Sequence, residues 1–205
     1  MKGTALPNDS STSQTRTVER SSTPISPWVN LEAISAIMPG GTEPVTYHAI
    51  GQADYVQVLC LHENGSIVLV RQYRPVVDCW TLEFPAGLRD GDEPPAETAR
   101  REVQEETGLR VLQIVSLLDC FADIGRLTNR FYGFAAAVRG EFQQTEPGVE
   151  ALFVTGPELR RLAAGGQLAH PGNLGLLYLA ADNPELQAIC AQHGIGDPRS
   201  MCLGW

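Results

Sequence analysis

The sequence lacks the features that mark membrane, secreted and nucleic-acid-binding proteins. No apolar run in the 205 residues approaches the roughly 20 residues of a membrane-spanning helix, and the polar N-terminus has no apolar signal-peptide segment. Basic residues are outnumbered, since the net charge is −9, which argues against broad contact with nucleic acid or an anionic membrane. We therefore expect a cytoplasmic protein that binds neither membrane nor nucleic acid.

Cysteine pairs and histidine clusters are missing as well. The five cysteines are odd in number, widely spaced and form no CxxC motif, which predicts reduced thiols. The four histidines show no metal-ligand spacing, so we expect no histidine in the catalytic centre. What is present, 43% hydrophobic and 19% charged residues, is typical of a globular protein with room for one well-cored domain and an appendage.

The composition changes along the chain and predicts four segments. Residues 1–26 are polar, rich in Ser and Thr and without apolar periodicity, which predicts a disordered tail. Residues 27–55 contain two short strand patterns around Pro39-Gly40-Gly41 and predict a small N-terminal β appendage. Residues 56–186 are expected to form the catalytic domain, and residues 187–205 a C-terminal helix and tail.

Strand and helix patterns alternate within the catalytic segment. Asn64-Gly65 supplies the positive φ angles of a tight hairpin between two core strands. Pro95 suits a first helical turn and Gly108 a left-handed stop, so a helix is predicted over residues 95–107. Strands interleaved with helices predict an α/β sandwich. Later strands are expected at about 111–119, 131–139 and 151–154, followed by two or three helices.

The predicted helix carries a cluster of carboxylates. On an ideal helix Glu102, Glu105 and Glu106 cover an arc of about 100°. As bare carboxylates, Glu102 and Glu106 would repel each other by roughly 0.2 to 0.5 kcal/mol, since they are four residues apart. Oxygen ligands without His or Cys suit a hard cation such as Mg²⁺ or Mn²⁺. On the string REVQEE alone, a solvated acidic face is the more common explanation, so the surrounding residues must decide.

The carboxylates belong to a longer spaced pattern, which consists of Gly87, Glu93, Arg101, Glu102, Glu105, Glu106, Gly108 and Leu109. This pattern resembles the Nudix box, without interruption. The resemblance implies a Nudix-type α/β/α sandwich with a mixed sheet and a helix that holds Mg²⁺, or Mn²⁺ in its place. It also implies that Glu102, Glu106 and the Ala86 carbonyl are metal ligands and that Glu105 is a ligand or the general base. Glu93 is expected to brace the box through Arg101, which in turn orients Glu105.

Two segments outside the box, RQYRP at 71–75 and LEFPAGL at 82–88, resemble the ADP-ribose and ADP-sugar diphosphatase branch of the Nudix family. That resemblance implies that Trp28 and Tyr47 stack on the base of the substrate. It also implies that Arg74 clamps the phosphates and that Glu83 contacts a ribose or a water network. Each assignment has a plain structural alternative: a strand anchor for Trp28, a surface arginine for Arg74 and an exposed strand residue for Glu83.

Three glutamates are candidates for the general base. In this branch a glutamate on a mobile loop often activates the attacking water, and Glu146 and Glu150 are the available candidates beside Glu105. One residue departs from the branch, because Ile124 in Asp123-Ile124-Gly125 stands where a proline is usual. Since that position is associated with ADP-ribose preference, the substrate is less firmly predicted than the chemistry.

The resemblance implies Mg²⁺-dependent hydrolysis of a nucleoside diphosphate linked to a sugar, foremost ADP-ribose, which would give AMP and ribose 5-phosphate. Other nucleotide sugars, such as an ADP-hexose or GDP-mannose, are the first alternative. A Nudix-fold sensor that binds ADP-ribose without turnover is the second, although a pure binder would not need clustered carboxylates. The branch is commonly dimeric through its N-terminal strands, so we expect a homodimer in which this segment also helps bind the base.

Overall fold

The computed structural model describes residues 16–143, 146–168 and 170–203. The chain divides into two compact units. The first comprises residues up to 52 together with 121–129, and the second comprises 53–120 together with 130–205. Because the two units are separate bodies, each is described by itself.

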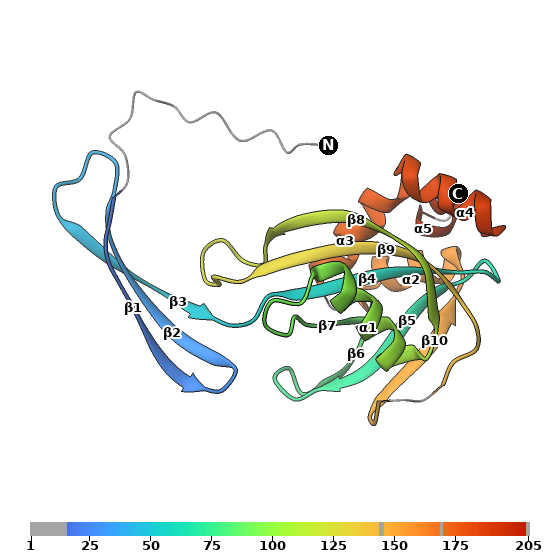
Figure 1. Ribbon diagram of the computed structural model, residues 1–205, viewed down its shortest axis with the longest axis horizontal. Coiled ribbons are helices and arrows are strands. Elements are labelled where there is room, and N and C mark those ends of the chain that lie inside the picture. Colours follow the sequence, from blue (N-terminus) through green and yellow to red (C-terminus); the bar gives the residue numbers. More distant parts are fainter. Residues whose placement is uncertain (1–15, 144–145, 169, 204–205) are drawn as a thin grey trace. The chain divides into compact units, whose positions relative to one another are not determined.

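The first unit is a three-stranded antiparallel sheet in the order β1-β2-β3 (Figure 1), built from Arg16–Ser26, Val29–Ile37 and Pro44–Gly51. The loop at 121–129 joins it by a short parallel bridge between Ile50 and Leu127. The Ile50 N–H donates to the Arg126 carbonyl over 2.8 Å, and the Thr128 N–H donates to the Ile50 carbonyl over 3.1 Å. These backbone bonds fix the loop against the sheet.

The prediction of a disordered tail over residues 1–26 is wrong for residues 16–26, which form β1. All 11 residues of β1 are exposed, so the strand has no buried face and no apolar alternation that a sequence pattern could reveal. It is organised by backbone pairing with β2, from Arg16 opposite Ile37 to Ser26 opposite Val29. The remainder of the predicted tail, residues 1–15, lies outside the described residues.

The second unit contains a mixed sheet with the strand order β10-β5-β4-β9-β8. The pairing of β4 with β9 is parallel, whereas β5 runs antiparallel to both β4 and β10. Two short strands lie off this path, since β6 pairs with β5 and β7 pairs with β4. The strands are β4 (Tyr55–His62), β5 (Ile67–Arg74), β6 (Cys79–Glu83), β7 (Ala86–Leu88), β8 (Arg110–Phe121), β9 (Arg130–Arg139) and β10 (Val149–Val154).

Helices cover both faces of this sheet, with α1 in front of it and α2 and α3 behind it in Figure 1. Val56, Val58 and Cys60 of β4 pack in one buried cluster with α1. Because side chains alternate along a strand, Gln57 points to the opposite face, where it meets Gly172 of α3. The predicted α/β/α sandwich with a mixed sheet is therefore confirmed. The helices are α1 (Pro95–Thr107), α2 (Gly156–Ala164), α3 (Pro171–Ala181), α4 (Pro184–His193) and α5 (Pro198–Leu203).

The first helix begins and ends where the sequence predicts. Pro95 occupies the first turn, and Gly108 adopts the left-handed conformation with φ of 73° while its N–H donates to the Gln104 carbonyl. The C-terminal part has four helices among the described residues rather than two or three, because the six-residue α5 is too short to show periodicity. No helix of the described segments is long and apolar enough to cross a membrane.

Candidate active site

The acidic helix α1 lies directly against β7. A Cβ atom at Gly87 would collide with the carboxylate of Glu102, so only glycine allows the strand and the helix to approach this closely. The buried side of α1 includes the small Ala99 and, one turn later, Val103, which both lie in the core. The carboxylate side of the helix therefore borders the Ala86-Gly87 backbone.

Glu106 is the most buried carboxylate of the cluster, with 5% of its surface exposed. Its Oε2 accepts a hydrogen bond from the Ala86 N–H over 3.0 Å. Burial raises the pKa of Glu106 to about 8, although the Ala86 N–H acts in the opposite direction. The nearby Arg74 of β5 favours the ionised form of Glu106, and a bound cation would favour it further.

Glu102 is held by its neighbour Arg101. The Nη1 of Arg101 donates to Oε1 of Glu102 over 2.7 Å and to Oε2 of Glu105 over 3.0 Å. Its Nη2 donates to Oε2 of Glu93 over 3.2 Å and to the Leu88 carbonyl over 3.1 Å. Burial raises the pKa of Glu102, while Arg101 partly compensates. The structure thus contains a contact between Glu93 and Arg101 and one between Arg101 and Glu105, as the expected brace requires.

The donor chemistry of this cluster fits a hard cation. Glu102 and Glu106 are buried carboxylates whose charged forms are disfavoured, and a divalent cation would stabilise both. Within the described ranges, no three His, Cys, Asp or Glu side chains form a ready-made ligand cage. Mg²⁺ does not require one, because it is usually held by one or two carboxylates together with waters and substrate phosphates.

A second charged group lies on β5 and β6. Arg74 binds Glu83 through two hydrogen bonds, Nε to Oε1 at 2.8 Å and Nη2 to Oε2 at 2.7 Å, and Thr81 donates to the same carboxylate over 2.6 Å. Although burial favours the neutral acid, these bonds lower the pKa of Glu83. Arg74 also interacts electrostatically with Glu106 and Glu146. The structure thus brings Arg74 to the carboxylate cluster and makes Glu83 the side chain that orients it.

The two loop candidates for the general base have different surroundings. Glu150 lies on β10, where its Oε2 accepts from Nη1 of Arg71 over 3.0 Å, and the Arg71 guanidinium lies 4.2 Å from the centre of the Trp80 ring. Glu150 also borders a cavity of about 340 Å³ together with Glu106. Glu146 precedes β10 and borders a different cavity of about 310 Å³, together with Glu102, Glu105 and Pro147.

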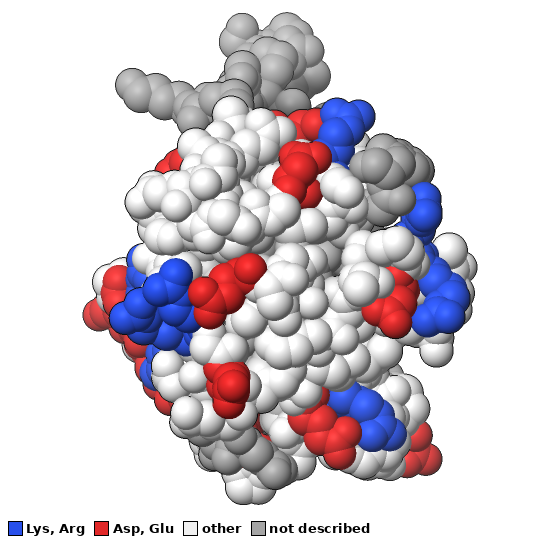
Figure 2. Space-filling view, turned by 90° about the vertical axis from the view of Figure 1, so that its right-hand side faces the viewer, with Lys and Arg blue, Asp and Glu red and all other residues white. Residues whose placement is uncertain are grey.

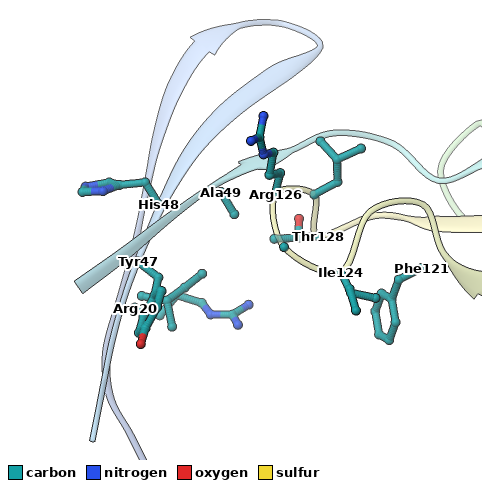
Figure 3. Close-up of a pocket in the computed structure, with 11 residues that line it drawn as sticks. Arg20, Tyr47, His48, Ala49, Phe121, Ile124, Arg126 and Thr128 are labelled. Carbon is teal, nitrogen blue, oxygen red and sulfur yellow. The ribbon is translucent and has the colours of Figure 1, made fainter. Parts of the chain in front are cut away.

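In the first unit, Tyr47 lines a cavity of about 710 Å³. Arg20 pairs with Ile34, and Ile34 pairs with Tyr47, so the three side chains share one face of the sheet. In Figure 3 the guanidinium of Arg20 extends toward the loop that carries Phe121 and Ile124, whereas His48 points away from that loop. The other lining residues are Ala49, Gly125, Arg126, Leu127 and Thr128.

Trp28 does not take part in this cavity. It lies in the turn between β1 and β2 with 71% of its surface exposed. Ile34, the cross-strand partner of Tyr47, is six residues further along, which corresponds to about 20 Å of strand. The described chain therefore separates the two aromatic residues that the sequence analysis grouped together.

Arg20 and Arg126 were not among the predicted site residues. Arg20 falls in the segment assigned to the tail, and Arg126 belongs to no recognisable motif, so neither carried a local signal. Both line the Tyr47 cavity and add positive charge to it. On the face drawn in Figure 2, by contrast, acidic and basic side chains are interspersed without a continuous basic surface among the described residues.

Comparison with known proteins gives one family and several relatives. The NUDIX domain profile matches residues 52–170. A CMP-5'-(N-acetyl-N-hydroxy-3-aminopropyl)phosphonate hydrolase from Streptomyces rubellomurinus is 38% identical over 81 residues, which are 40% of this chain and 39% of that protein. An ADP-ribose pyrophosphatase from Mycobacterium tuberculosis is 40% identical over 83 residues, 40% of each chain. A GDP-mannose pyrophosphatase from Yersinia enterocolitica is 35% identical over 103 residues, 47% of this chain and 53% of that protein.

The matched regions cover only part of each relative. The chain spans about two fifths to one half of the length of the three relatives named above. The NUDIX match is longer, and it contains all of β4 to β7, α1 and β9. It therefore includes Arg74, Ala86 and the three carboxylates of α1, and on this match the chain belongs to the Nudix family.

Proposed function

We propose that the protein hydrolyses the diphosphate bond of a nucleoside diphosphate linked to a sugar, with Mg²⁺ as the cation. The observation that carries this proposal is the pair of buried carboxylates, Glu102 and Glu106, packed against the Ala86-Gly87 backbone. Their raised pKa values indicate a site that is completed by positive charge. A pure nucleotide sensor would not need these buried acids, so a hydrolase is the better explanation.

Glu102, Glu106 and the Ala86 carbonyl would hold the cation, with Glu105 as a further ligand. When bound, Mg²⁺ lowers the pKa of a coordinated water and neutralises charge that develops on the phosphoryl oxygens. Arg101 keeps Glu102 and Glu105 in place from the solvent side. Arg74, oriented by Glu83, can bind phosphate oxygens through its guanidinium.

For the general base we favour Glu146. Glu150 is engaged by Arg71, and Glu105 is engaged by Arg101, so each already has a basic partner at 3.0 Å. Glu146 instead borders the cavity that Glu102 and Glu105 line, and it lies shortly before β10. A carboxylate beside the cation can accept the proton of the attacking water.

ADP-ribose is the first substrate we would choose, with AMP and ribose 5-phosphate as products. The names of the three relatives contain CMP, ADP-ribose and GDP-mannose, so the shared region does not decide the base. The Tyr47 cavity supports base recognition, because an aromatic ring can stack on any base and guanidinium groups can stack or donate hydrogen bonds. Ile124, 91% exposed at the edge of this cavity, replaces the proline of the ADP-ribose branch, and GDP-mannose or an ADP-hexose is the alternative.

We also propose a homodimer in which the three-stranded unit contributes to association. Its strands present several large exposed apolar side chains, including Val18, Ile25 and Val45. Exposed apolar groups of this kind favour association with another protein surface. Sedimentation equilibrium of the full chain tests this directly, and a monomer at micromolar concentration would contradict it.

The enzymatic proposal is tested with a panel of nucleotide sugars in the presence of Mg²⁺. Chromatography should detect AMP from ADP-ribose, and EDTA should abolish its formation. If GDP-mannose or an ADP-hexose has the higher kcat/KM, the reaction class stands and the substrate is reassigned. Tight binding of ADP-ribose without any product from the panel would favour the sensor instead.

A further inference from the structure

The link between β6 and β7 joins the two halves of the candidate active site. Strand β6 pairs with β5 up to Glu83, and β7 pairs with β4 from Ala86 onward. Only Phe84 and Pro85 lie between them, where the chain passes from one neighbouring strand to the other. Their backbone groups therefore have no regular ladder partners.

Two hydrogen bonds provide partners for backbone groups of this link. The Pro85 carbonyl accepts from the Val58 N–H over 2.8 Å, within the same layer. The Phe84 N–H donates to Oδ1 of Asn173 over 3.3 Å. Phe84 and Asn173 are both fully buried, so water cannot readily take the place of this bond.

Asn173 belongs to the other face of the sheet. It lies in the first turn of α3, where its own N–H donates to the His170 carbonyl over 3.0 Å. The helix α3 packs on β4 and β9 from the face opposite α1. The bond from Phe84 to Asn173 thus fastens the link to a rigid helix in the second layer.

The position of the link affects both halves of the site. Immediately before it, Glu83 holds Arg74 by two hydrogen bonds. Immediately after it, the Ala86 N–H binds Glu106, and Gly87 lies against Glu102. A shift of Phe84 would therefore move the Ala86 carbonyl relative to the carboxylates of α1.

An asparagine is an unfavourable choice here for stability alone. Its Nδ2 is buried and has no hydrogen-bond partner in the described part of the chain, and the same holds for Oε1 of the neighbouring Gln57. Burying unpaired amide atoms costs free energy that an apolar side chain would not. The side-chain amide of Asn173 does, however, provide an acceptor for the Phe84 N–H.

We propose that Asn173 is a positioning residue for the cation site, acting through the Phe84 N–H on the Ala86 backbone. The proposal rests on the metal-dependent hydrolysis proposed above. Under this proposal α3 influences metal affinity, although it contains no residue of the box and neither of the loop glutamates. It also explains why a polar side chain occupies the tightly packed start of this helix.

The test measures Mn²⁺ binding directly, by the electron paramagnetic resonance signal of the free ion, with the full chain and no substrate. Asn173→Leu removes the acceptor at similar volume, and we expect Mn²⁺ affinity to fall at least about tenfold, as for other residues that support a metal ligand indirectly. Asn173→Asp keeps an oxygen at the same place and should restore most of the affinity. Should the leucine variant fail to fold by circular dichroism, Asn173→Ala removes the same acceptor without added bulk.

The matched control is Asn183→Ala. Asn183 also accepts a backbone N–H through Oδ1, from Leu186 over 2.9 Å, but it caps α4 and has no contact with the link. Loss of a cap lowers stability, so this variant should lower the melting temperature while leaving Mn²⁺ affinity unchanged. Folded Asn173→Leu with wild-type affinity, or equal loss in both variants, would overturn the positioning role. Wild-type protein that binds no Mn²⁺ would instead overturn the proposed metal centre itself.

Discussion

The backbone N–H of Ala86 donates to Oε2 of Glu106 over 3.0 Å. This one bond ties the strand that would supply a carbonyl ligand to the most buried carboxylate of the acidic helix. Burial raises the pKa of Glu106 to about 8, so the hydrogen bond does not by itself keep the carboxylate ionised.

Glu106→Gln should abolish most activity while retaining the fold. Glutamine keeps an oxygen that can accept the Ala86 N–H, but it is a much weaker Mg²⁺ ligand than a carboxylate. Since a catalytic metal contributes several kcal/mol of charge stabilisation, we expect kcat to fall at least about a hundredfold. Steady-state kinetics at saturating Mg²⁺ and a thermal melt check this result. Turnover close to wild type would remove Glu106 from the ligand set.

The metal-free protein should lose stability as the pH rises from about 4.5 to about 8. In this window the folded state keeps the proton on Glu106, whereas the unfolded state, with an ordinary pKa, has released it. The protonated form therefore contributes stability that is fully present below pH 4.5 and is lost as the pH rises through about 8. From this group alone the slope is about 1.4 kcal/mol per pH unit.

Urea denaturation at several pH values, with EDTA, measures this slope. Glu106→Gln is the matched control, and its slope should be smaller by the contribution of one proton. Millimolar Mg²⁺ should also flatten the wild-type profile, because a cation favours the ionised carboxylate. Identical pH profiles for the wild type and the glutamine variant would show that Glu106 has an ordinary pKa.

Glu146→Gln and Glu150→Gln should separate the two loop candidates. Removal of a general base typically costs about 10² to 10⁴ in rate, and we expect a loss in this range for Glu146→Gln with little change in KM. Glu150→Gln leaves the cavity beside Glu102 intact and breaks only the exposed ion pair with Arg71, so kcat should fall less than about threefold. The reverse order of effects would make Glu150 the base.

How much of this site the sequence predicts depends on how local each signal is. Pro95, the carboxylate spacing and the C-cap Gly108 all belong to one helix and its end, and the bounds of this helix are as predicted. Glu83 is different, because its partner Arg74 is a neighbour only through the pairing of β5 with β6. A strand such as β1, with no buried residue, leaves no apolar pattern to read. Contacts made across strands or layers therefore account for what the sequence did not reveal.

Pairing across strands also explains why Tyr47 and Trp28, two aromatic residues of the first unit, have different surroundings. The resemblance to the ADP-sugar diphosphatase branch implies that Tyr47 and Trp28 both stack on the base of the substrate. Sheet register places Tyr47 beside Ile34 and Arg20 in a cavity, whereas Trp28 lies in an exposed turn. Register is set by long-range pairing and by the length of each turn, which a single strand pattern does not specify.

Tyr47→Ala should therefore weaken substrate binding, and Trp28→Ala should not. Stacking on a base contributes about 1 to 3 kcal/mol, so KM should rise roughly fivefold or more in Tyr47→Ala. We expect kcat to change little, because the ring would contact the base and not the reacting phosphates. Tyr47→Phe retains the ring and should behave as wild type. Trp28→Ala should change KM less than about twofold.

Comparing ADP-ribose with GDP-mannose in these variants identifies what the cavity recognises. Stacking alone tolerates any base, so its loss should raise KM for both substrates by similar factors. Arg20→Ala and Arg126→Ala remove hydrogen-bond donors from the same cavity and should change the ratio between the two substrates. An unchanged KM for every substrate in Tyr47→Ala would place base recognition elsewhere, and the preference among nucleotide sugars would then have to come from the phosphate and sugar side of the site.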